Sequence, residues 1–492
     1  MGTTIKMTNE ISQDLQANLL ELNRRFNSAP DLVVRVLQSP RLERQIALIY
    51  MDGLTDKAII HTYMVKPVLE SGDIDMMEST APFLVQTSTL DELESALLNG
   101  FSVVLEAGSN VARMMNAQGW PERAIEEPQL EATLKGAHLG FTETYSQNIA
   151  MIRRYVANRE LNIEEVTIGD RVQTKIAVIS IGDIANPELL EELKGRISRI
   201  QVDSVLNTGM LIEWIEDNPY SPFPQFLMTE RPDVTASELL QGRFCVVVDR
   251  SPSVVIGPST MNAFFQSTDD FGTRWIVASF IRILRFLGLL MALFLPSIYI
   301  AIISFNYEII PLELLLTIGE VRGSVPFPPF IEALIMEITL EMLREAGIRL
   351  PSPIGQTVGI VGGIVLGQTA VQAGIVSNLM VIVVAFTAIA TFIIPSYDMG
   401  AAIRFIRFPM MIISAMFGIT GIVIGAMILI GHLISLESLG TPYSSPLMPI
   451  RIADWKDSII RLPIWLLKKR PQSVPAQQGV RMGDHNREEG NA

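Results

Sequence analysis

Three glutamates and two glutamines are the residues of this chain whose spacing suggests chemistry. Glu337, Glu341 and Glu345 recur every four residues in "FIEALIMEITLEMLREAG", so on a helix they form one acidic stripe. Further along, Gln368 and Gln372 lie in a long run without charged residues. Carboxylates in such a row attract cations, and amides within an apolar helix bind water or a neighbouring helix. Both patterns indicate ion or helix interactions rather than covalent catalysis.

Enzyme signatures are absent from the sequence. It has no GxSxG nucleophile turn and no P-loop lysine, and the single cysteine, Cys245, lies in the apolar run "FCVVVD". None of the four histidines has a second ligand at metal spacing, and we interpret polar turn residues such as Asp52, Asp56 and Asn186 as helix caps. We therefore expect no catalytic residue, no metal and no cofactor. The histidines are His61, His138, His432 and His485.

The stretch "TVGIVGGIVLGQTAVQAG" is rich in glycine without being a phosphate loop. No charged residue occurs from Leu350 to Tyr397, whereas a dinucleotide loop belongs to a soluble unit and is followed by an acidic residue. Its glycines repeat every four residues, a spacing that lets membrane helices pack closely. This predicted helix-packing seam consists of Gly359, Gly363 and Gly367.

The opposite face of the same predicted helix carries the more informative residues. They are Thr357, Val361, Val365, Gln368 and Gln372, which fall within about 80° of one another on a helix. One interpretation is a narrow pore, with an apolar constriction followed by polar rings. The other is that both glutamines bond neighbouring helices, which is common in membranes. The residues alone favour neither interpretation.

The glutamate stripe also has two interpretations. Its helix is predicted to run from about Phe330 to Ala346 and to stop at Gly347, with its apolar positions at helical spacing. The stripe could be a solvated face relieved by Arg344, and without further information we favour that interpretation. In a ring-shaped oligomer it would instead concentrate cations at a pore mouth.

Composition and charge divide the chain into a charged part and an apolar part. The net charge of −14 and the pI of about 4.9 exclude nucleic acid as a partner, and 49% of residues are hydrophobic. After Arg274 there are three uncharged runs, Phe286–Tyr307, Leu350–Tyr397 and Phe408–Leu436. The first and third each suit one crossing of a bilayer, and the middle run suits two, with a break near residues 372–374. We expect four spans, with three as the alternative.

Basic residues flank the predicted spans unevenly. Arg274, Arg282 and Arg285 precede the first span, and a basic cluster follows the last. Because positive residues stay on the cytoplasmic side, we expect both termini to face the cytoplasm. Arg404 and Arg407 do not fit this scheme: they would lie on the far side or in a re-entrant or interfacial turn.

The charged part contains an internal duplication. "IALIYMDGLTDKAII" (Ile46–Ile60) and "IAVISIGDIANPELL" (Ile176–Leu190) both read as an apolar strand, a Gly/Asp turn and a helix. Leu97–Met114 and Leu239–Gly257 both read as a helix end, a glycine and a β-hairpin. We therefore predict two tandem small α/β subdomains followed by a polytopic helical membrane domain of about four spans plus one amphipathic or re-entrant helix.

The predicted domain organisation has six parts. They are a partly disordered N-terminal extension (1–30), subdomain 1 (31–140), a connecting helix (141–165), subdomain 2 (166–275), the transmembrane domain (276–436), and a cytoplasmic C-terminal tail with a disordered end (437–492).

Four stretches of the sequence resemble a known family. They are "TERPDV", "VVVDRSPSVVIGPSTMNAFFQSTDDF", the block from "EVRGSVPFPPFIEALIMEITLEMLREAGIRLPSP" through "IGQTVGIVGGIVLGQTAVQAGIVS", and "DWKDSIIRLPIWLLKKRP". Together they resemble the A subunit of spore germinant receptors, the GerA family. The resemblance covers roughly Leu32 to Pro471, and the core motifs show no departure from it.

The resemblance implies a location and a set of partners. It implies a multi-pass protein of the inner membrane of the bacterial spore, acting with a transporter-like B subunit and a lipoprotein C subunit. It further implies a homo-oligomer, a pentamer, that forms a nutrient-gated channel for monovalent cations and so starts germination. On this basis the Val361–Gln372 face becomes candidate pore lining, and the glutamate stripe becomes a candidate cation vestibule.

Three alternatives to a channel-forming receptor subunit remain. One is a non-conducting membrane scaffold that relays the germinant signal, and another is the related family member linked to dipicolinate release. A secondary transporter ranks lowest, because it would require inverted membrane repeats and a broken-helix substrate site. The repeat found in this sequence lies in the charged part instead.

Overall fold

The computed structural model describes residues 9–37, 44–71, 84–119, 128, 131, 136–351, 362–363 and 367–482. The chain divides into two units, each assembled from separate stretches. The first, here called the α/β unit, comprises residues 1–216, 226–259 and 468–492. The second, the helical unit, comprises residues 217–225 and 260–467.

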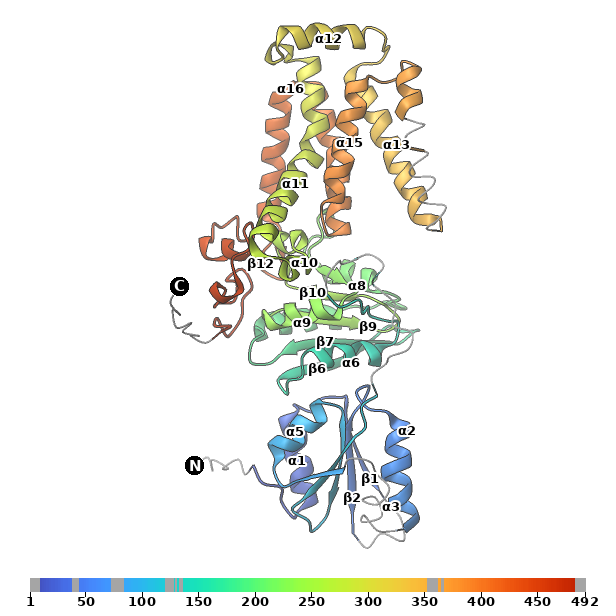
Figure 1. The fold of residues 1–492 in the computed structure, drawn as a ribbon, viewed down its shortest axis with the longest axis vertical. Coiled ribbons are helices and arrows are strands. Elements are labelled where there is room, and N and C mark those ends of the chain that lie inside the picture. Colours follow the sequence, from blue (N-terminus) through green and yellow to red (C-terminus); the bar gives the residue numbers. More distant parts are fainter. Residues whose placement is uncertain are drawn as a thin grey trace. The chain divides into compact units, whose positions relative to one another are not determined.

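The first half of the α/β unit is an antiparallel five-stranded sheet covered by helices on both faces (Figure 1). The two faces follow from strand alternation, because successive side chains point to opposite sides of a sheet. In β2 (Ile46–Met51), Ala47, Ile49 and Met51 pack toward α1 (Leu15–Arg25) and α5 (Leu90–Leu98). The alternate residues pack toward the helical segment formed by α2 (Lys57–Ile60), η1 (His61–Val65) and α3 (Lys66–Ser71). The remaining strands are β1 (Leu32–Leu37), β3 (Leu84–Thr87), β4 (Phe101–Glu106) and β5 (Ala112–Asn116).

The second half repeats this topology. Strand order is β1-β2-β4-β5-β3 in the first sheet and β6-β7-β9-β10-β8 in the second, with every pair antiparallel. In both halves the hairpin follows a glycine in the left-handed region, Gly100 (φ 79°) and Gly242 (φ 100°). The predicted duplication is therefore confirmed. The strands are β6 (Leu161–Ile168), β7 (Thr174–Ile181), β8 (Leu227–Thr229), β9 (Phe244–Val248) and β10 (Val254–Gly257); the helices are α6 (Tyr145–Tyr155), α7 (Pro187–Ser198), α8 (Thr208–Ile215) and α9 (Pro232–Leu240).

Three segments differ from the sequence-based expectation. Helix α1 lies in the stretch expected as an N-terminal extension, yet its Leu15 and Leu22 are buried in the first core. The predicted connecting helix over 141–165 is helical only in α6, and strand β6 begins at Leu161, because "NIEEVTI" pairs with β7 along its length.

The C-terminal tail is the third segment. Residues 468–482 pack on the second half of the α/β unit: Ala476 pairs with Ala185, and Gln477 N–H donates to the Ile184 carbonyl at 2.8 Å. A Cβ on Gly242 would come within 2.7 Å of the Ala476 Cβ, so this glycine lets the tail approach closely. Ordered structure therefore extends well into the stretch predicted as a polar tail.

The helical unit is a bundle of largely apolar helices (Figure 1). Helix α13 was predicted to stop at Gly347 but continues to Arg349. It ends there because Leu350 precedes Pro351, which disfavours the helical conformation, and Leu350 is extended at ψ 148°. The elements are η2 (Met261–Phe265), α10 (Asp269–Gly272), α11 (Trp275–Ser304), η3 (Tyr307–Ile309), α12 (Leu312–Arg322), α13 (Pro329–Arg349), α15 (Asn378–Phe392), α16 (Tyr397–Ser435), β11 (Glu437–Ser438), β12 (Thr441–Pro442), η4 (Ile452–Asp457) and η5 (Ile464–Leu466).

Helix α16 is a hairpin of two arms, residues 397–417 and 419–435. Gly418 between them has φ 59° and ψ −141°, which only glycine adopts easily. The chain doubles back there: a Cβ on Gly425 would lie 2.6 Å from the Met410 Sδ, fifteen residues earlier. We expected Phe408–Leu436 to make one crossing; the structure reverses the chain at Gly418 inside that run, and the number of crossings stays a prediction.

Contacts with α11 fix the direction of both arms. The first arm runs parallel to α11, since Arg407 bonds the Ala292 carbonyl (2.8 Å) and Ser414 bonds the Ser297 carbonyl (2.6 Å). The second arm returns toward the segment that precedes α11: beyond the arm, the Tyr443 carbonyl accepts a hydrogen bond from Met261 N–H in η2 at 2.7 Å. The chain therefore enters and leaves the bundle at the same end.

Two helices in the described part of the chain are long and apolar enough to cross a membrane, Trp275–Ser304 and Tyr397–Ser435. Helix α15 is equally apolar but shorter, and the break predicted near Gln372–Gly374 is present, with Gly374 at φ 68°. Residues 352–361 and 364–366 lie outside the described range. The expected number of four crossings stays a prediction.

Candidate functional site

Helix α13 buries two of its carboxylates and exposes several of its large apolar residues. Glu332 and Glu337 are buried, at 0% and 3% exposed, whereas Ile338 is 44% and Met342 is 68% exposed. In water the hydrophobic effect would produce the reverse arrangement. A helix oriented in this way is suited to an apolar surrounding with polar partners inside the bundle.

The partner of Glu337 is Arg407, on the first arm of α16. Arg407 forms an ion pair with Glu337, donates to Thr391 Oγ1 at 2.9 Å and donates to the Ala292 carbonyl at 2.8 Å. One guanidinium thus joins α13, α15, α16 and α11. Buried charge is tolerated only with such pairing, and this contact explains why a basic residue occurs in the apolar sequence.

Glu341 and Glu345 lie further along the same helix and are more exposed. Glu341 pairs with Arg344 at 3.3 Å and with Arg404 at 3.2 Å. Glu345 pairs with Arg349 at 2.6 Å. The stripe is therefore neutralised by arginines rather than left to repel itself, as isolated carboxylates at this spacing would.

Glu332 lies in the first turn of α13 and holds several groups around it. It forms an ion pair with Arg322 at 2.9 Å and accepts a hydrogen bond from Ser377 N–H at 2.9 Å. The Ser377 hydroxyl in turn lies 3.1 Å from the Tyr299 hydroxyl, which also accepts from Arg322 at 3.1 Å. Ser377 is the N-cap of α15, so this carboxylate fixes where α15 begins.

The sequence does not identify Glu332, Arg322 or Arg407 as partners in ion pairs. One feature of the sequence could have indicated these pairs. Arg404 and Arg407 are two cations three residues apart in an apolar run, and the carboxylates on α13 have a similar spacing. Helical periodicity alone cannot find such pairs, because the partners are separated by about 60 to 70 residues.

The predicted pore-lining residues are only partly within the described range. Thr357, Val361 and Val365 lie outside it, while Gln368 and Gln372 are exposed on the short helix before Gly374. Of the predicted seam, Gly359 lies outside the described residues, and a Cβ on Gly363 would meet nothing within 4 Å. Gly367 is buried, with its Cβ position 3.8 Å from Val381. Both assignments stay predictions.

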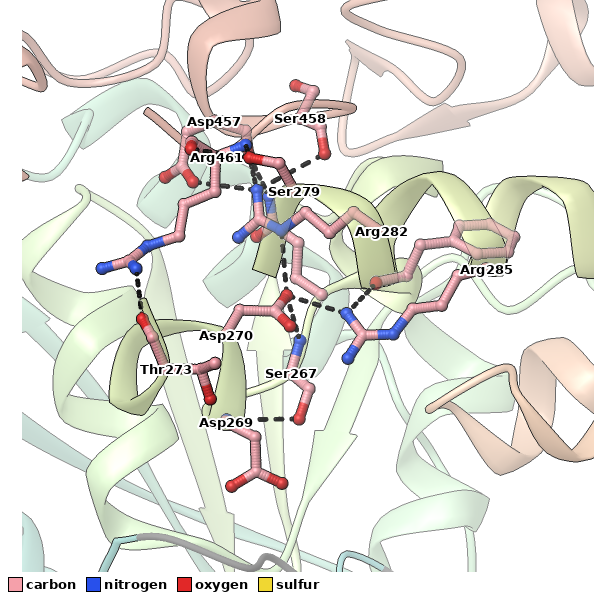
Figure 2. A network of polar contacts seen from close by, with 12 residues as sticks. Ser267, Asp269, Asp270, Thr273, Ser279, Arg282, Arg285, Asp457, Ser458 and Arg461 are labelled. Carbon is pink, nitrogen blue, oxygen red and sulfur yellow. Dashed lines mark hydrogen bonds and ion pairs between the residues drawn. The ribbon is translucent and has the colours of Figure 1, made fainter. Parts of the chain in front are cut away.

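A second buried network lies where α11 begins. Asp270, 2% exposed, accepts hydrogen bonds from Arg282 at 2.9 Å and Arg285 at 2.7 Å; Figure 2 shows both guanidinium groups directed toward this carboxylate. Arg282 also pairs with Asp457 at 3.0 Å, after the last apolar helix. The stretches "STDDF" and "DWKDSIIRLP", almost 190 residues apart, are therefore joined through one helix.

Arg461 completes this network. Its backbone N–H donates to the Ser279 hydroxyl at 3.1 Å, that hydroxyl donates to the Arg461 carbonyl at 2.9 Å, and the guanidinium donates to the Thr273 carbonyl at 2.9 Å (Figure 2). Burial, and secondarily the nearby Arg282, lower the pKa of Arg461. In the sequence, Arg282 and Arg285 indicate only the orientation of the first span; their contacts with "STDDF" cannot be seen there.

The α/β unit has its own buried ion pair between the two halves of the duplication. Arg153 in α6 is fully buried and forms two hydrogen bonds of 2.9 Å with the Asp31 carboxylate at the start of β1. The guanidinium also donates to the carbonyls of Asn158 and Leu161. This bidentate geometry is the strong form of the interaction.

The described residues contain no group of three or more metal-ligating side chains. Cys245 is fully buried in β9, and burial raises the pKa of its thiol well above the usual range. A protonated, inaccessible thiol is a packing residue rather than a nucleophile.

Comparison with known proteins places these features in a family. The model of the "Bacillus/Clostridium GerA spore germination protein" family matches residues 20–473. The chain is 40% identical over 489 residues to "Spore germination protein KA" of Bacillus subtilis (strain 168), covering 97% of this chain and 90% of that one. It is 37% identical over 493 residues to "Uncharacterized membrane protein YfkQ" of the same organism, covering 98% and 96%. A crystal structure of the N-terminal domain of the A subunit of the Bacillus megaterium spore germinant receptor GerK3 aligns at 24% identity and a TM-score of 0.41, covering 52% of this chain and 99% of that one.

Proposed function

Because this chain belongs to the GerA family of Bacillus and Clostridium spore germination proteins, we propose that it is a germinant receptor A subunit that forms a cation channel. In this proposal it spans the spore inner membrane several times, with both termini on the core side. It assembles as a ring, a pentamer, together with a transporter-like B subunit and a lipoprotein C subunit. Opening of the ring by a nutrient releases monovalent cations and starts germination.

The observation that carries the proposal is the inverted polarity of the helical unit. Large apolar side chains point outward along α11, α13, α15 and α16, while Glu332, Glu337, Arg404 and Arg407 are buried at 9% exposure or less. Lipid is the natural surrounding for such a surface. The chain also enters and leaves the bundle at one end, as an even number of crossings requires.

Within the ring, we propose that the Thr357, Val361, Val365, Gln368 and Gln372 face lines the pore. Gln368 and Gln372 support this because both are exposed in the single chain, so a neighbouring copy or water can meet their amides. The glycines Gly359, Gly363 and Gly367 would form the packing seam. Glu341 and Glu345 are the better vestibule candidates, because they keep solvent contact, whereas the Glu337 carboxylate already binds Arg407.

The favoured test measures ion flux. The full chain, purified with its partner subunits, is reconstituted in potassium-loaded liposomes, and efflux is recorded after each of the common amino acids is added in turn. We expect triggered potassium release, and we expect Glu341→Lys to slow it several-fold, because reversing the charge lowers the local cation concentration.

The matched control is Glu320→Lys on α12, which reverses an exposed glutamate outside the stripe and should leave efflux unchanged. If an intact complex releases no potassium under any addition but its variants still block germination in spores, the scaffold alternative replaces the channel. Equal slowing by both variants would remove Glu341 from the vestibule.

A further inference from the structure

The segment after the last apolar helix exposes an unusual amount of apolar surface. Between residues 448 and 466 the chain forms two short turns, η4 and η5, without a helix long enough to cross a membrane. The exposed side chains include Ile450 (70%), Ile452 (72%), Trp455 (38%), Ile464 (46%), Trp465 (53%) and Leu466 (51%). Soluble proteins rarely display such clusters unless something covers them.

The position of this segment along α11 is fixed by the network of Figure 2. Arg461 is bonded to Ser279 through two backbone–hydroxyl hydrogen bonds, and Asp457 is paired with Arg282. Ser279 and Arg282 lie in the first turns of α11. The segment therefore lies beside the beginning of that helix.

The length of α11 places that beginning outside the hydrocarbon layer. Its 30 residues correspond to about 45 Å, whereas the hydrocarbon core of a bilayer is about 30 Å thick. The uncharged part after Arg285 is about 28 Å long and already fills the core. The turns that carry Ser279, Arg282 and Arg285 then lie at the level of the lipid headgroups, and residues 448–466 lie there with them.

The residue types suit that level. Tryptophan prefers the boundary between headgroups and acyl chains, because its ring is apolar and its N–H polar. The exposed Lys456 lies in η4, and Lys468 and Lys469 follow η5 in the sequence, in a chain whose net charge is −14. Basic residues beside a span attract anionic lipid.

From this placement we infer that residues 448–466 form an interfacial anchor, whose apolar side chains insert into the headgroup layer of an anionic membrane. The inference rests on the proposed membrane insertion of α11. The anchor fixes the depth of the N-terminal end of α11 in the membrane. Because Arg461 and Asp457 are bonded to that end, any movement of the helix must also move Ile452 and Trp465.

Spin labels on single cysteines test this in the full chain. The only native cysteine, Cys245, is fully buried, so an introduced cysteine is the labelling site. We place labels at Ile452 and Trp465, at Leu20 on the α/β unit (70% exposed) as an aqueous reference, and at Met427 on α16 (67% exposed) as a hydrocarbon reference. Vesicles of phosphatidylethanolamine with phosphatidylglycerol are compared with vesicles of phosphatidylcholine.

We expect the ratio of collisions with oxygen to collisions with a nickel chelate to be several-fold higher at 452 and 465 than at 20, and below the ratio at 427. Lys456→Glu should lower the ratio at 452 in the anionic vesicles and leave it unchanged in phosphatidylcholine. A ratio at 452 and 465 equal to that at 20 overturns the anchor.

Two further outcomes are distinguishable. If the ratio at 427 also equals that at 20, membrane insertion itself fails, and with it the proposed function. If labels at 452 and 465 are shielded from both reagents and show spin–spin broadening that disappears on dilution with unlabelled chain, a second copy covers the segment, and the anchor is overturned.

Discussion

Arg407 shows what a single charge does inside this apolar bundle. It is 4% exposed and contacts a carboxylate, a hydroxyl and a carbonyl from three other helices. Removing one member of a buried pair leaves the other charged and without solvation, which is more harmful than replacing both. Removing one member of the pair must therefore lower the stability of the helical unit.

We predict that Arg407→Met destabilises the helical unit by about 3–5 kcal/mol, because Glu337 is left as an uncompensated buried charge. Denaturant titration of the full chain in detergent micelles measures this directly. The double variant Arg407→Met with Glu337→Met should recover most of the loss, since no buried charge then remains.

The control for this prediction is Arg349→Met, whose pair with Glu345 is 77% and 58% exposed and should contribute less than about 1 kcal/mol. Equal effects of the two single variants would show that burial of the pair is unimportant. A double variant no more stable than Arg407→Met alone would show that lost packing, rather than stranded charge, is responsible.

At this scale the sequence predicts residue types better than their surroundings. The spacing of Glu337, Glu341 and Glu345 is visible in the sequence. Taken alone it favours a solvated face, because an amphipathic pattern is usually interpreted for a helix in water, and the resemblance then makes the stripe a candidate cation vestibule. The structure turns Glu337 inward, where Arg407 meets it. Nothing in the local sequence links residues 70 positions apart.

Among the elements, the α16 hairpin depends on one backbone position. Gly418 has a positive φ, and a Cβ there would approach the Phe305 Cβ and the Asn306 Oδ1 at 3.0 and 3.1 Å. Neighbouring glycines also let the arms approach, since a Cβ on Gly425 would meet the Met410 sulfur. The reversal needs both the conformation and the space.

We predict that Gly418→Ala lowers the stability of the bundle by about 1–3 kcal/mol, because alanine is strained at positive φ and its Cβ crowds Phe305 and Asn306. Thermal unfolding of the full chain in micelles, followed by protease sensitivity of the 397–435 region, checks this. Gly431→Ala is the matched control: it lies in the second arm with nothing within 4 Å of its Cβ, and alanine there should be neutral or stabilising by up to about 1 kcal/mol. Loss of stability in the control alone would contradict the hairpin.

The contrast between the two units explains what could be predicted at the element scale. The duplication was predictable because a strand, a turn with Gly and Asp, and a helix follow one another in the same order from Ile46 and again from Ile176. The hairpin was not, because both arms are apolar and Gly418 is one of several glycines in the run. Hydropathy shows that a segment is apolar enough for lipid, but it does not show where the chain reverses direction.

For the whole molecule, the first crossing decides the topology. If α11 crosses once and the chain returns to the same end, α12 lies on the side opposite both termini. We predict that Leu312→Cys is labelled by a membrane-impermeant maleimide in intact cells, whereas Leu20→Cys and Val480→Cys are labelled only after permeabilisation. All three side chains are exposed, at 70%, 70% and 62%.

The control is the native chain, whose buried Cys245 should remain unlabelled in both conditions. Labelling of positions 20 and 480 on different sides would require an odd number of crossings and would exclude the proposed orientation. Labelling of all three from the same side would exclude a crossing by α11.

The paths of the chain between the two units have a consequence for biogenesis. The polypeptide passes from the α/β unit to the helical unit after Glu216, returns at Phe226, leaves again after Ser259 and comes back at Lys468. The contact between Ala185 and Ala476 in the α/β unit joins residues about 290 positions apart, and the later one follows all the apolar helices in the sequence. The ribosome must therefore synthesise every apolar helix before the α/β unit can fold completely. A chain truncated within the helices lacks part of both units.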